Sequence, residues 1–235
     1  MKESINTRPL SPGQLLLTAF YLLILPAMLF VFSGDWYWTE GWVFTVIYIV
    51  LCALTVVYLY FNDRALLKER YRGAFQKEQK AWDKLFLSVF VTLYFLSFIV
   101  MPLDARRFHW SPPFPFWIKM IGALLLAASF LCILEVFREN TFAAPVVKIQ
   151  EERHQHVIST GLYGIVRHPM YAGALMLFFG VPLLLGSIYG LAIGLAMSVL
   201  IAARSVGEEK ALREELPGYG DYMQKVRWRL IPFVF

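Results

Sequence analysis

The residues best suited to chemistry lie between Gly161 and Gly173, in the sequence Gly-Leu-Tyr-Gly-Ile-Val-Arg-His-Pro-Met-Tyr-Ala-Gly. Pro169 suits the first turn of a helix, where its missing N–H donor costs nothing. Arg167 and His168 would then lie beside free backbone N–H groups and the positive helix end, which together favour a carboxylate or phosphate. Tyr171 would face that cradle from the first turn. The alternative is an ordinary basic membrane boundary with an aromatic anchor.

A second polar group, Arg204-Ser-Val-Gly-Glu208-Glu209, ends the last apolar stretch. The spacing places Arg204 and Glu208 on one face of a helix. Carboxylates at a helix C-terminus oppose the helix macrodipole, so two adjacent ones there call for an explanation. They could hold ribose hydroxyls or balance a sulfonium charge. They could equally form the solvated end of a long helix and pair with Arg204.

Membrane-spanning helices must position these residues. The chain has 235 residues, of which 58% are hydrophobic and 17% charged, and its mean hydropathy is +0.56. Soluble domains contain about 45–50% apolar residues, and a spanning helix needs about 20 in succession. We therefore predict an all-α, polytopic transmembrane bundle that forms a single membrane domain over residues 1–235. The six predicted segments are 14–33, 41–61, 85–103 and 116–136, then a hairpin over 170–203 that turns at Gly186, Ser187 and Gly190.

The basic residues predict the orientation of this bundle. If the N-terminus is cytoplasmic, 19 of the 22 Lys and Arg residues fall in cytoplasmic segments, and only Arg106, Arg107 and Lys119 fall outside. The positive-inside rule favours this arrangement, with both termini in the cytoplasm. The spans of residues 1–137 would then support a cytoplasmic pocket formed by residues 138–235. Topology explains the net charge of +5 better than a nucleic-acid partner does, so we predict no nucleic-acid binding.

The cysteines and loop histidines do not form a metal or disulfide pattern. Cys52 and Cys132 lie in apolar stretches with no CxxC or Cys/His spacing, which favours a packing role. His154 and His156 form an HxH pair that lacks a third convergent ligand. We therefore predict no metal site.

The segment 62–84 mixes both signs of charge and spaces its apolar residues roughly as an interfacial helix does. These residues are Leu66, Leu67, Tyr71 and Phe75. We interpret the segment as a linker at the level of the lipid headgroups.

Taken together, the motifs resemble the isoprenylcysteine carboxyl methyltransferase family. The mark of that family is RHPxYxG, then a hydrophobic hairpin, then a Glu-Glu pair, and this sequence has all three in order. The lead-in Val-Val-Lys-Ile-Gln, the run Val-Ile-Ser-Thr-Gly-Leu-Tyr and the tail from Leu216 to Pro232 are also similar to the family. The specific resemblance covers residues 140–235, whereas the earlier spans resemble broader bacterial relatives only in pattern. It implies an integral protein of the bacterial inner membrane.

By position, the resemblance implies a pocket for S-adenosylmethionine and a neighbouring site for a methyl acceptor. Arg204 would be the catalytic residue that orients the acceptor or stabilises charge on it. This sequence has Gln155 where the family can have histidine, and Leu162 where relatives often have proline. The implied cofactor contacts are Gln150, Gln155, His156, Val157, Ile158, Tyr163, Arg167, His168, Pro169, Met170, Tyr171, Glu208 and Glu209.

The implied reaction is S-adenosylmethionine-dependent methyl transfer at the cytoplasmic membrane face. The acceptor would be an amphiphilic thiol or carboxylate, a small thiol or a phospholipid amine, so membrane lipids and small molecules are the expected partners. In-line displacement requires aligned reactants and excluded water. Two alternatives stay open. One is an NADPH-dependent membrane reductase of the sterol Δ14 type, which shares an Arg-His-Pro-x-Tyr helix start, and the other is a non-enzymatic membrane scaffold or transporter.

Overall fold

The computed structural model describes residues 11–73, 76 and 79–235, and in these residues the chain is all-helical, as predicted. One isolated bridge joins Val166 and Trp228. The N-terminal residues 1–10, expected in the cytoplasm, and Phe75 lie outside the described residues. The α-helices are α1 (Pro12–Ser33), α2 (Thr39–Asn62), α3 (Arg64–Tyr71), α4 (Ala81–Pro102), α5 (Phe116–Glu139), α6 (Pro169–Leu185), α7 (Ile188–Glu215) and α8 (Tyr219–Lys225).

Five of these helices, α1, α2, α4, α5 and α7, are long and apolar enough to cross a membrane. The sixth predicted segment corresponds to α6, which is apolar but has only 17 residues. At 1.5 Å per residue, α6 is about 26 Å long, slightly less than the thickness of a bilayer core. The hydropathy pattern therefore located every apolar helix, but it missed the end of α7, which continues 12 residues beyond the predicted 203 to Glu215 because its last turns are polar.

The hairpin between α6 and α7 turns within two residues. Gly186 ends α6 in the left-handed conformation, with φ of 82°, which glycine adopts without strain. Ser187 then begins α7, because its side-chain oxygen accepts a hydrogen bond of 2.8 Å from the N–H of Gly190. The turn predicted at Gly186 and Ser187 is confirmed. Gly190 is not part of it, because the Ser187 cap places Gly190 inside the first turn of α7.

Glycines bring the apolar helices close together. A Cβ atom at Gly122 of α5 would lie 2.3 Å from the backbone nitrogen of Leu184 in α6, so only glycine permits this approach. Gly190 and Gly194 have the GxxxG spacing that favours close helix contact in membranes. A Cβ at Gly194 would lie 2.4 Å from the carbonyl oxygen of Phe178. Backbone contacts therefore fix α6 between α5 and α7.

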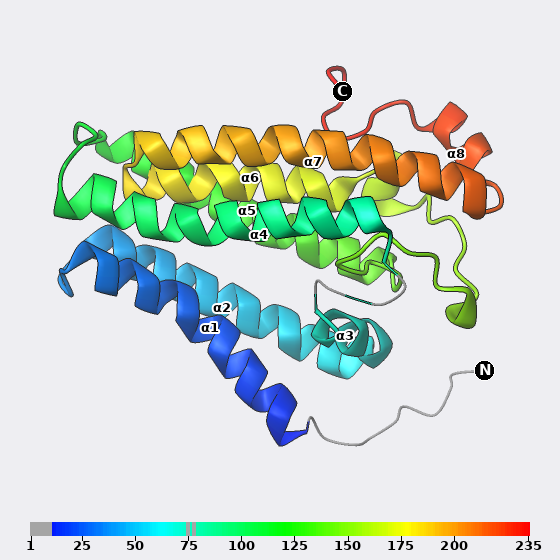
Figure 1. Cartoon of the computed structure of the whole chain (residues 1–235), viewed down its shortest axis with the longest axis horizontal. Coiled ribbons are helices and arrows are strands. Elements are labelled where there is room, and N and C mark those ends of the chain that lie inside the picture. Colours follow the sequence, from blue (N-terminus) through cyan, green and yellow to red (C-terminus); the bar gives the residue numbers. More distant parts are fainter. Residues whose placement is uncertain (1–10, 74–75, 77–78) are drawn as a thin grey trace.

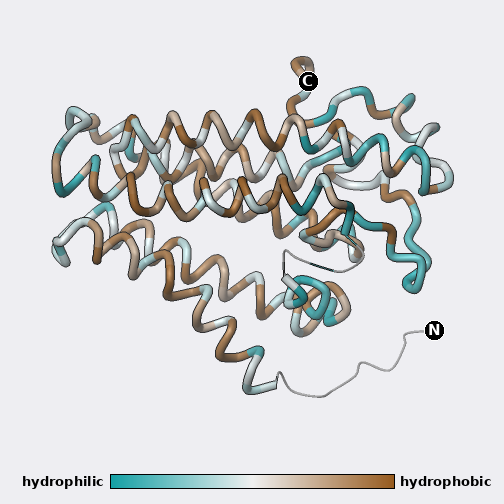
Figure 2. Tube along the Cα trace, in the orientation of Figure 1, coloured by the Kyte–Doolittle hydropathy of each residue, from teal (hydrophilic) through white to brown (hydrophobic). Residues whose placement is uncertain are grey.

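The helices run back and forth so that the polar segments gather at one end of the bundle (Figure 1). This end carries α3, the segment 140–168, the C-terminal part of α7 and α8. The opposite end carries the α1–α2 loop and the Gly186 turn. Figure 2 shows hydrophilic residues concentrated at the former end, which we call the polar end. The two chemically interesting sequence motifs thus lie on the same side of the bundle.

Helix α3 belongs to the polar end and packs against the bundle. Leu66 and Leu67 are buried in a cluster with Leu59, Val136 and Phe137. The segment that we interpreted as a headgroup-level linker therefore contains a helix, and the apolar face of this helix contacts protein. Arg70 of α3 donates a hydrogen bond of 3.0 Å to the carbonyl oxygen of Ala143, which ties α3 to the segment 140–168.

Candidate active site

The N-terminus of α6 is anchored by the C-terminal tail. Pro169 occupies the first turn, as predicted, and His168 is the N-cap residue. The backbone N–H groups of Arg167 and His168 donate to the carbonyl oxygens of Trp228 and Arg229, each at 2.9 Å. A segment distant in sequence therefore holds the Arg-His-Pro motif in place.

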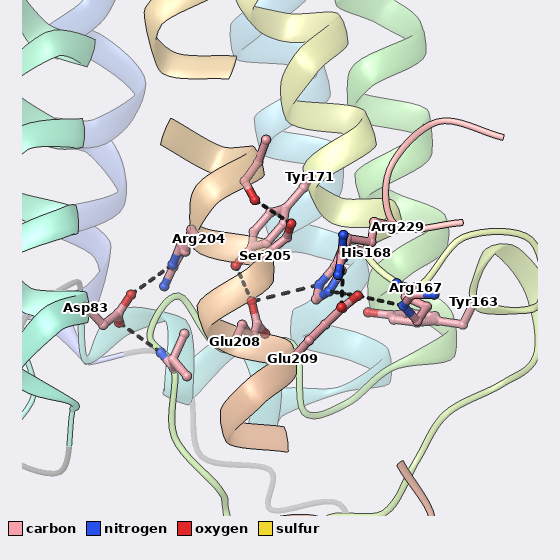
Figure 3. A network of polar contacts seen from close by, with 12 residues as sticks. Asp83, Tyr163, Arg167, His168, Tyr171, Arg204, Ser205, Glu208, Glu209 and Arg229 are labelled. Atoms are coloured by element: carbon pink, nitrogen blue, oxygen red, sulfur yellow. Dashed lines mark hydrogen bonds and ion pairs between the residues drawn. The ribbon is translucent and has the colours of Figure 1, made fainter. Parts of the chain in front are cut away.

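Glu209 lies at the centre of a buried ion cluster (Figure 3). Its Oε1 atom is 2.6 Å from Nε of Arg167 and 3.3 Å from Nε2 of His168, and its Oε2 atom is 2.8 Å from Nε of Arg229. Nη1 of Arg167 also donates to the carbonyl oxygens of Val226 and Arg227. Protein donors thus hold both carboxylate oxygens of Glu209.

Glu208, the neighbouring acid, has a different environment. Its carboxylate accepts a hydrogen bond from the hydroxyl of Tyr171, as Figure 3 shows. The Tyr171 ring stacks on His168, with centroids 5.3 Å apart and planes 7° apart. The Glu208 side chain keeps 24% of its exposure and faces a cavity, whereas Glu209 keeps 3%. Of the two acids, Glu208 is the one available to a ligand.

This cavity lies at the polar end, between the segment 140–168, the N-terminus of α6, the end of α7 and α8. It encloses about 880 Å³ of empty space, part of it open to solvent. Ten predicted cofactor contacts line it: Gln155, His156, Val157, Ile158, Tyr163, Arg167, His168, Met170, Tyr171 and Glu208. The structure therefore brings together most of the residues that the resemblance implied.

Three predicted contacts lie outside the lining of this cavity. Glu209 is enclosed in its ion cluster, and Pro169 instead lines an apolar groove beside α5. Gln150 is 1% exposed and donates from Nε2 to the carbonyl oxygen of Phe142 at 2.8 Å. Its backbone N–H donates to Oε1 of Gln155, a lining residue, at 2.8 Å. A direct contact of these three residues with a cofactor stays a prediction.

The sequence reasoning missed Tyr219 and Tyr222 of α8, which also line the cavity. Tyr222 donates from its hydroxyl to the carbonyl oxygen of Tyr163 at 2.7 Å. The hydroxyl of Tyr219 is buried and has no hydrogen-bond partner among the described residues. Burial, followed by the negative charges of Glu209 and Glu208, raises the pKa of Tyr219 above its usual value. The tail motif from Leu216 to Tyr222 was the signal that could have identified both tyrosines.

Arg204, the predicted catalytic residue, lies in α7 one turn before Glu208, but it is buried and is not among the residues that line the cavity. Its Nε is 2.9 Å from Oδ1 of Asp83, and its Nη2 donates to the carbonyl oxygen of Pro145 at 3.0 Å. The guanidinium also lies over the rings of Phe86 and Tyr171, at 5.0 and 5.7 Å from their centroids. Arg204 thus pairs with Asp83, an acid that no sequence motif indicated.

Comparison with known families connects this geometry to a reaction. Residues 117–217 match the model of the family described as phospholipid methyltransferase. Over this stretch, the chain is similar to that family. The phospholipid methyltransferases belong to the same group of membrane methyltransferases as the isoprenylcysteine enzymes, so the resemblance in the motifs is confirmed. No curated protein gives a significant match to the chain.

The methyltransferase match spans α5, α6 and most of α7, together with the segment 140–168. With five helices long enough to cross a bilayer, it indicates an integral membrane methyltransferase. Arg204 and Glu208 lie inside the matched stretch, whereas Asp83, Tyr219 and Arg229 lie outside it. The structure therefore places three polar residues from outside the matched stretch at or beside the candidate site.

Proposed function

We propose that this protein transfers the methyl group of S-adenosylmethionine to an amphiphilic acceptor at the membrane surface. One observation carries the proposal. The loop that enters the α6–α7 hairpin and the acid Glu208 that leaves it meet at the polar end and face one cavity. Part of the cavity wall comes from α7, one of the helices long and apolar enough to cross a membrane.

The lining residues fit the chemical groups of this cofactor. Glu208 offers a carboxylate to its cationic or hydroxyl groups, and the apolar walls formed by Val157, Ile158 and Met170 suit a nucleoside. The unpartnered hydroxyl of Tyr219 can form a hydrogen bond with a polar atom of a ligand. S-adenosylmethionine, when bound, supplies an electrophilic methyl group on a sulfonium.

The residues of the chain would then act by orientation and by excluding water. An in-line displacement needs the acceptor atom close to the methyl group and aligned with the breaking bond, and such alignment accounts for much of the rate gain. We assign Arg204 to the acceptor because it lies one turn before Glu208 and over the ring of Tyr171, and both of these residues line the cavity. Its positive charge can orient an acceptor and stabilise negative charge on it.

The apolar side chains around Arg204 favour a lipophilic acceptor. An aromatic and aliphatic cluster of α4, α6 and α7 lies directly beneath it and includes Phe86, Phe90, Phe178 and Met197. An acceptor with an apolar tail can approach between these helices while its reactive group remains at the polar end. A thiol, a carboxylate and an amine all meet this description.

The membrane orientation follows the positive-inside rule. We propose that the polar end is cytoplasmic and that the protein resides in a bacterial inner membrane. Basic residues at or near this end lie in the described ranges 64–73, 79–84, 138–167 and 204–229. Labelling of single-cysteine variants of the protein in intact cells tests this orientation. If a thiol reagent added outside the cells labels a cysteine at the polar end, the assignment is overturned.

A methyl-transfer assay with radiolabelled S-adenosylmethionine tests the proposal directly. The panel contains phosphatidylethanolamine vesicles, dodecanethiol, S-dodecylcysteine and 2-mercaptoethanol. We expect label in at least one amphiphilic acceptor and a higher rate in bilayers than in dilute detergent. Binding of NADPH without binding of S-adenosylmethionine would support a reductase instead. Methylation of 2-mercaptoethanol alone, at equal rates with and without a bilayer, would contradict lateral entry of the acceptor.

A further inference from the structure

Asp83, in the first turn of α4, is a carboxylate with 0% exposure. An acid in the first turn of a helix stabilises it through the macrodipole and can do so while facing solvent. Burial adds a large desolvation cost that is tolerated when the charge is paired and hydrogen-bonded. The location of Asp83 therefore needs a partner, and that partner is Arg204, 2.9 Å away.

The remaining acceptor positions of Asp83 are also used. Its Oδ2 atom accepts hydrogen bonds from Nε2 of Gln79 at 2.8 Å and from the backbone N–H of Val147 at 3.0 Å. The carboxylate thus joins the start of α4, the loop that walls the cavity, and α7, as seen in Figure 3. These three elements are distant in sequence and meet at this one group.

The contacts hold the guanidinium of Arg204 from one edge. Nε donates to Asp83 and Nη2 donates to Pro145, whereas Nη1 makes no hydrogen bond with a described residue. The rings of Phe86 and Tyr171 cover the group and limit its rotation. Tyr171 in turn donates to Glu208, so the orientation of Arg204 is linked to the acid that faces the cavity.

We propose that Asp83 is a positioning residue that orients Arg204 toward the methyl acceptor. This inference rests on the proposed function. Packing supports a fixed geometry, because the Trp82 ring lies against α7 at Gly207, where a Cβ would come within 3.0 Å of it. Without the carboxylate, Arg204 keeps its charge but loses the contact that sets its direction.

A purely structural role for Asp83 can be separated from this one by a matched control. Asp104 is equally buried, at 0% exposure, and lies at the opposite end of the bundle. Its carboxylate accepts hydrogen bonds from the N–H and hydroxyl of Ser111, both at 2.8 Å, and from the hydroxyl of Ser187. Asp104→Asn therefore makes the same chemical change at a site far from the cavity. It should affect folding to a similar extent.

The experiment compares Asp83→Asn, Asp104→Asn and wild type in the full chain, with radiolabelled S-adenosylmethionine and the panel acceptor that the wild type methylates fastest. We expect Asp83→Asn to lower kcat about 10- to 100-fold, because small misplacements of an orienting group have effects of this size. The affinity for S-adenosylmethionine, measured by calorimetry, should change less than threefold. Asp104→Asn should keep kcat within about twofold of the wild type, whatever it does to the unfolding temperature.

A double-substitution cycle tests whether Asp83 acts through Arg204. If it does, Asp83→Asn should cause little further loss of kcat in an Arg204→Ala background, because the group that it orients is already absent. Gln79→Met provides a milder variant that removes one donor to Asp83 and keeps the volume of the side chain. It should lower kcat a few-fold in a protein that folds normally.

Each outcome separates the two hypotheses. A wild type that neither binds S-adenosylmethionine nor transfers its methyl group would overturn the proposed function and this inference with it. If the wild type transfers methyl and both Asp83→Asn and Gln79→Met retain the wild-type kcat, only the role of Asp83 is overturned. Equal loss of kcat in Asp104→Asn, or full additivity with Arg204→Ala, would also overturn it.

Discussion

The carboxylate of Glu209 lies 2.6 Å from Nε of Arg167, and both side chains are buried, at 3% and 6% exposure. This contact joins the end of α7 to the start of α6, and Arg229 of the tail pairs with the same carboxylate. Removing one partner of a buried ion cluster leaves the other charges uncompensated, which costs about 3–5 kcal/mol. The contact therefore helps to hold the start of α6 and the end of α7 together beside the cavity.

We predict that Glu209→Gln lowers the unfolding temperature in detergent by roughly 10 °C, as expected for a loss of about 3 kcal/mol in a chain of this size. Circular dichroism at the helix band measures it. The matched control is Glu135→Gln, which removes an exposed pair with Arg138 and should leave the unfolding temperature unchanged. An equal effect of the two substitutions would show that the buried cluster does not stabilise the fold.

Glu208 and His168 should determine the affinity for S-adenosylmethionine, whereas Arg204 should determine turnover. We predict that Glu208→Ala and His168→Ala each weaken S-adenosylmethionine binding by tenfold or more, because charged hydrogen bonds contribute about 1.5–3 kcal/mol. Arg204→Ala should mainly lower kcat. Isothermal calorimetry and the radiolabel assay measure the two quantities. Unchanged affinity in both of the first two variants would remove the site assignment.

Loss of the hydroxyl should have a different effect on stability at each of the two tyrosines of α8. Tyr219→Phe should leave the stability of the ligand-free protein unchanged or slightly higher, since its hydroxyl has no partner in the described structure. It should weaken S-adenosylmethionine binding several-fold. Tyr222→Phe removes the hydrogen bond to Tyr163 and should cost about 1 kcal/mol of stability. Thermal unfolding with and without the cofactor distinguishes the two, and the same response in both variants would contradict the assignment.

Acid should weaken the attachment of α3 through Glu69. Burial alone would raise the pKa of Glu69, but hydrogen bonds from Lys148 and Gln76 and the charges of Lys148 and Arg72 outweigh it and lower the pKa. A lowered pKa in the folded state stabilises the protein above the usual pKa of a glutamate, and this stability is lost as the pH falls through the lowered value.

We therefore predict that Glu69→Gln is less stable than the wild type at pH 7 and that the difference shrinks as the pH falls below about 4.5. Unfolding temperatures recorded from pH 7 to pH 3 measure it. A difference that stays constant over this range would show that the charge of Glu69 does not stabilise the fold.

Much of the fold could be predicted because it depends on local sequence. The lengths of the apolar runs specified the spanning helices, since a helix in lipid must satisfy its own backbone and cover about 30 Å. Gly186 and Ser187 specified the hairpin turn through their own backbone and capping preferences. Pro169 likewise marked the start of α6.

The partners of the polar residues could not be predicted in this way. Asp83 lies 121 residues before Arg204, in a segment whose composition indicates only a polar linker. The hydroxyl of Tyr219 and the tail carbonyls that hold Arg167 also reach the site from outside the recognised motif. No local pattern records such contacts, because they arise from the way whole helices pack.

The Glu208-Glu209 pair shows the same division within two adjacent residues. The sequence by itself determined that two acids follow the apolar hairpin, and the family resemblance gave both the same role. Each residue of an α-helix is rotated by about 100° from the one before it, so adjacent side chains point in different directions. Only the tertiary structure decided that Glu208 faces the cavity while Glu209 is enclosed by Arg167, His168 and Arg229.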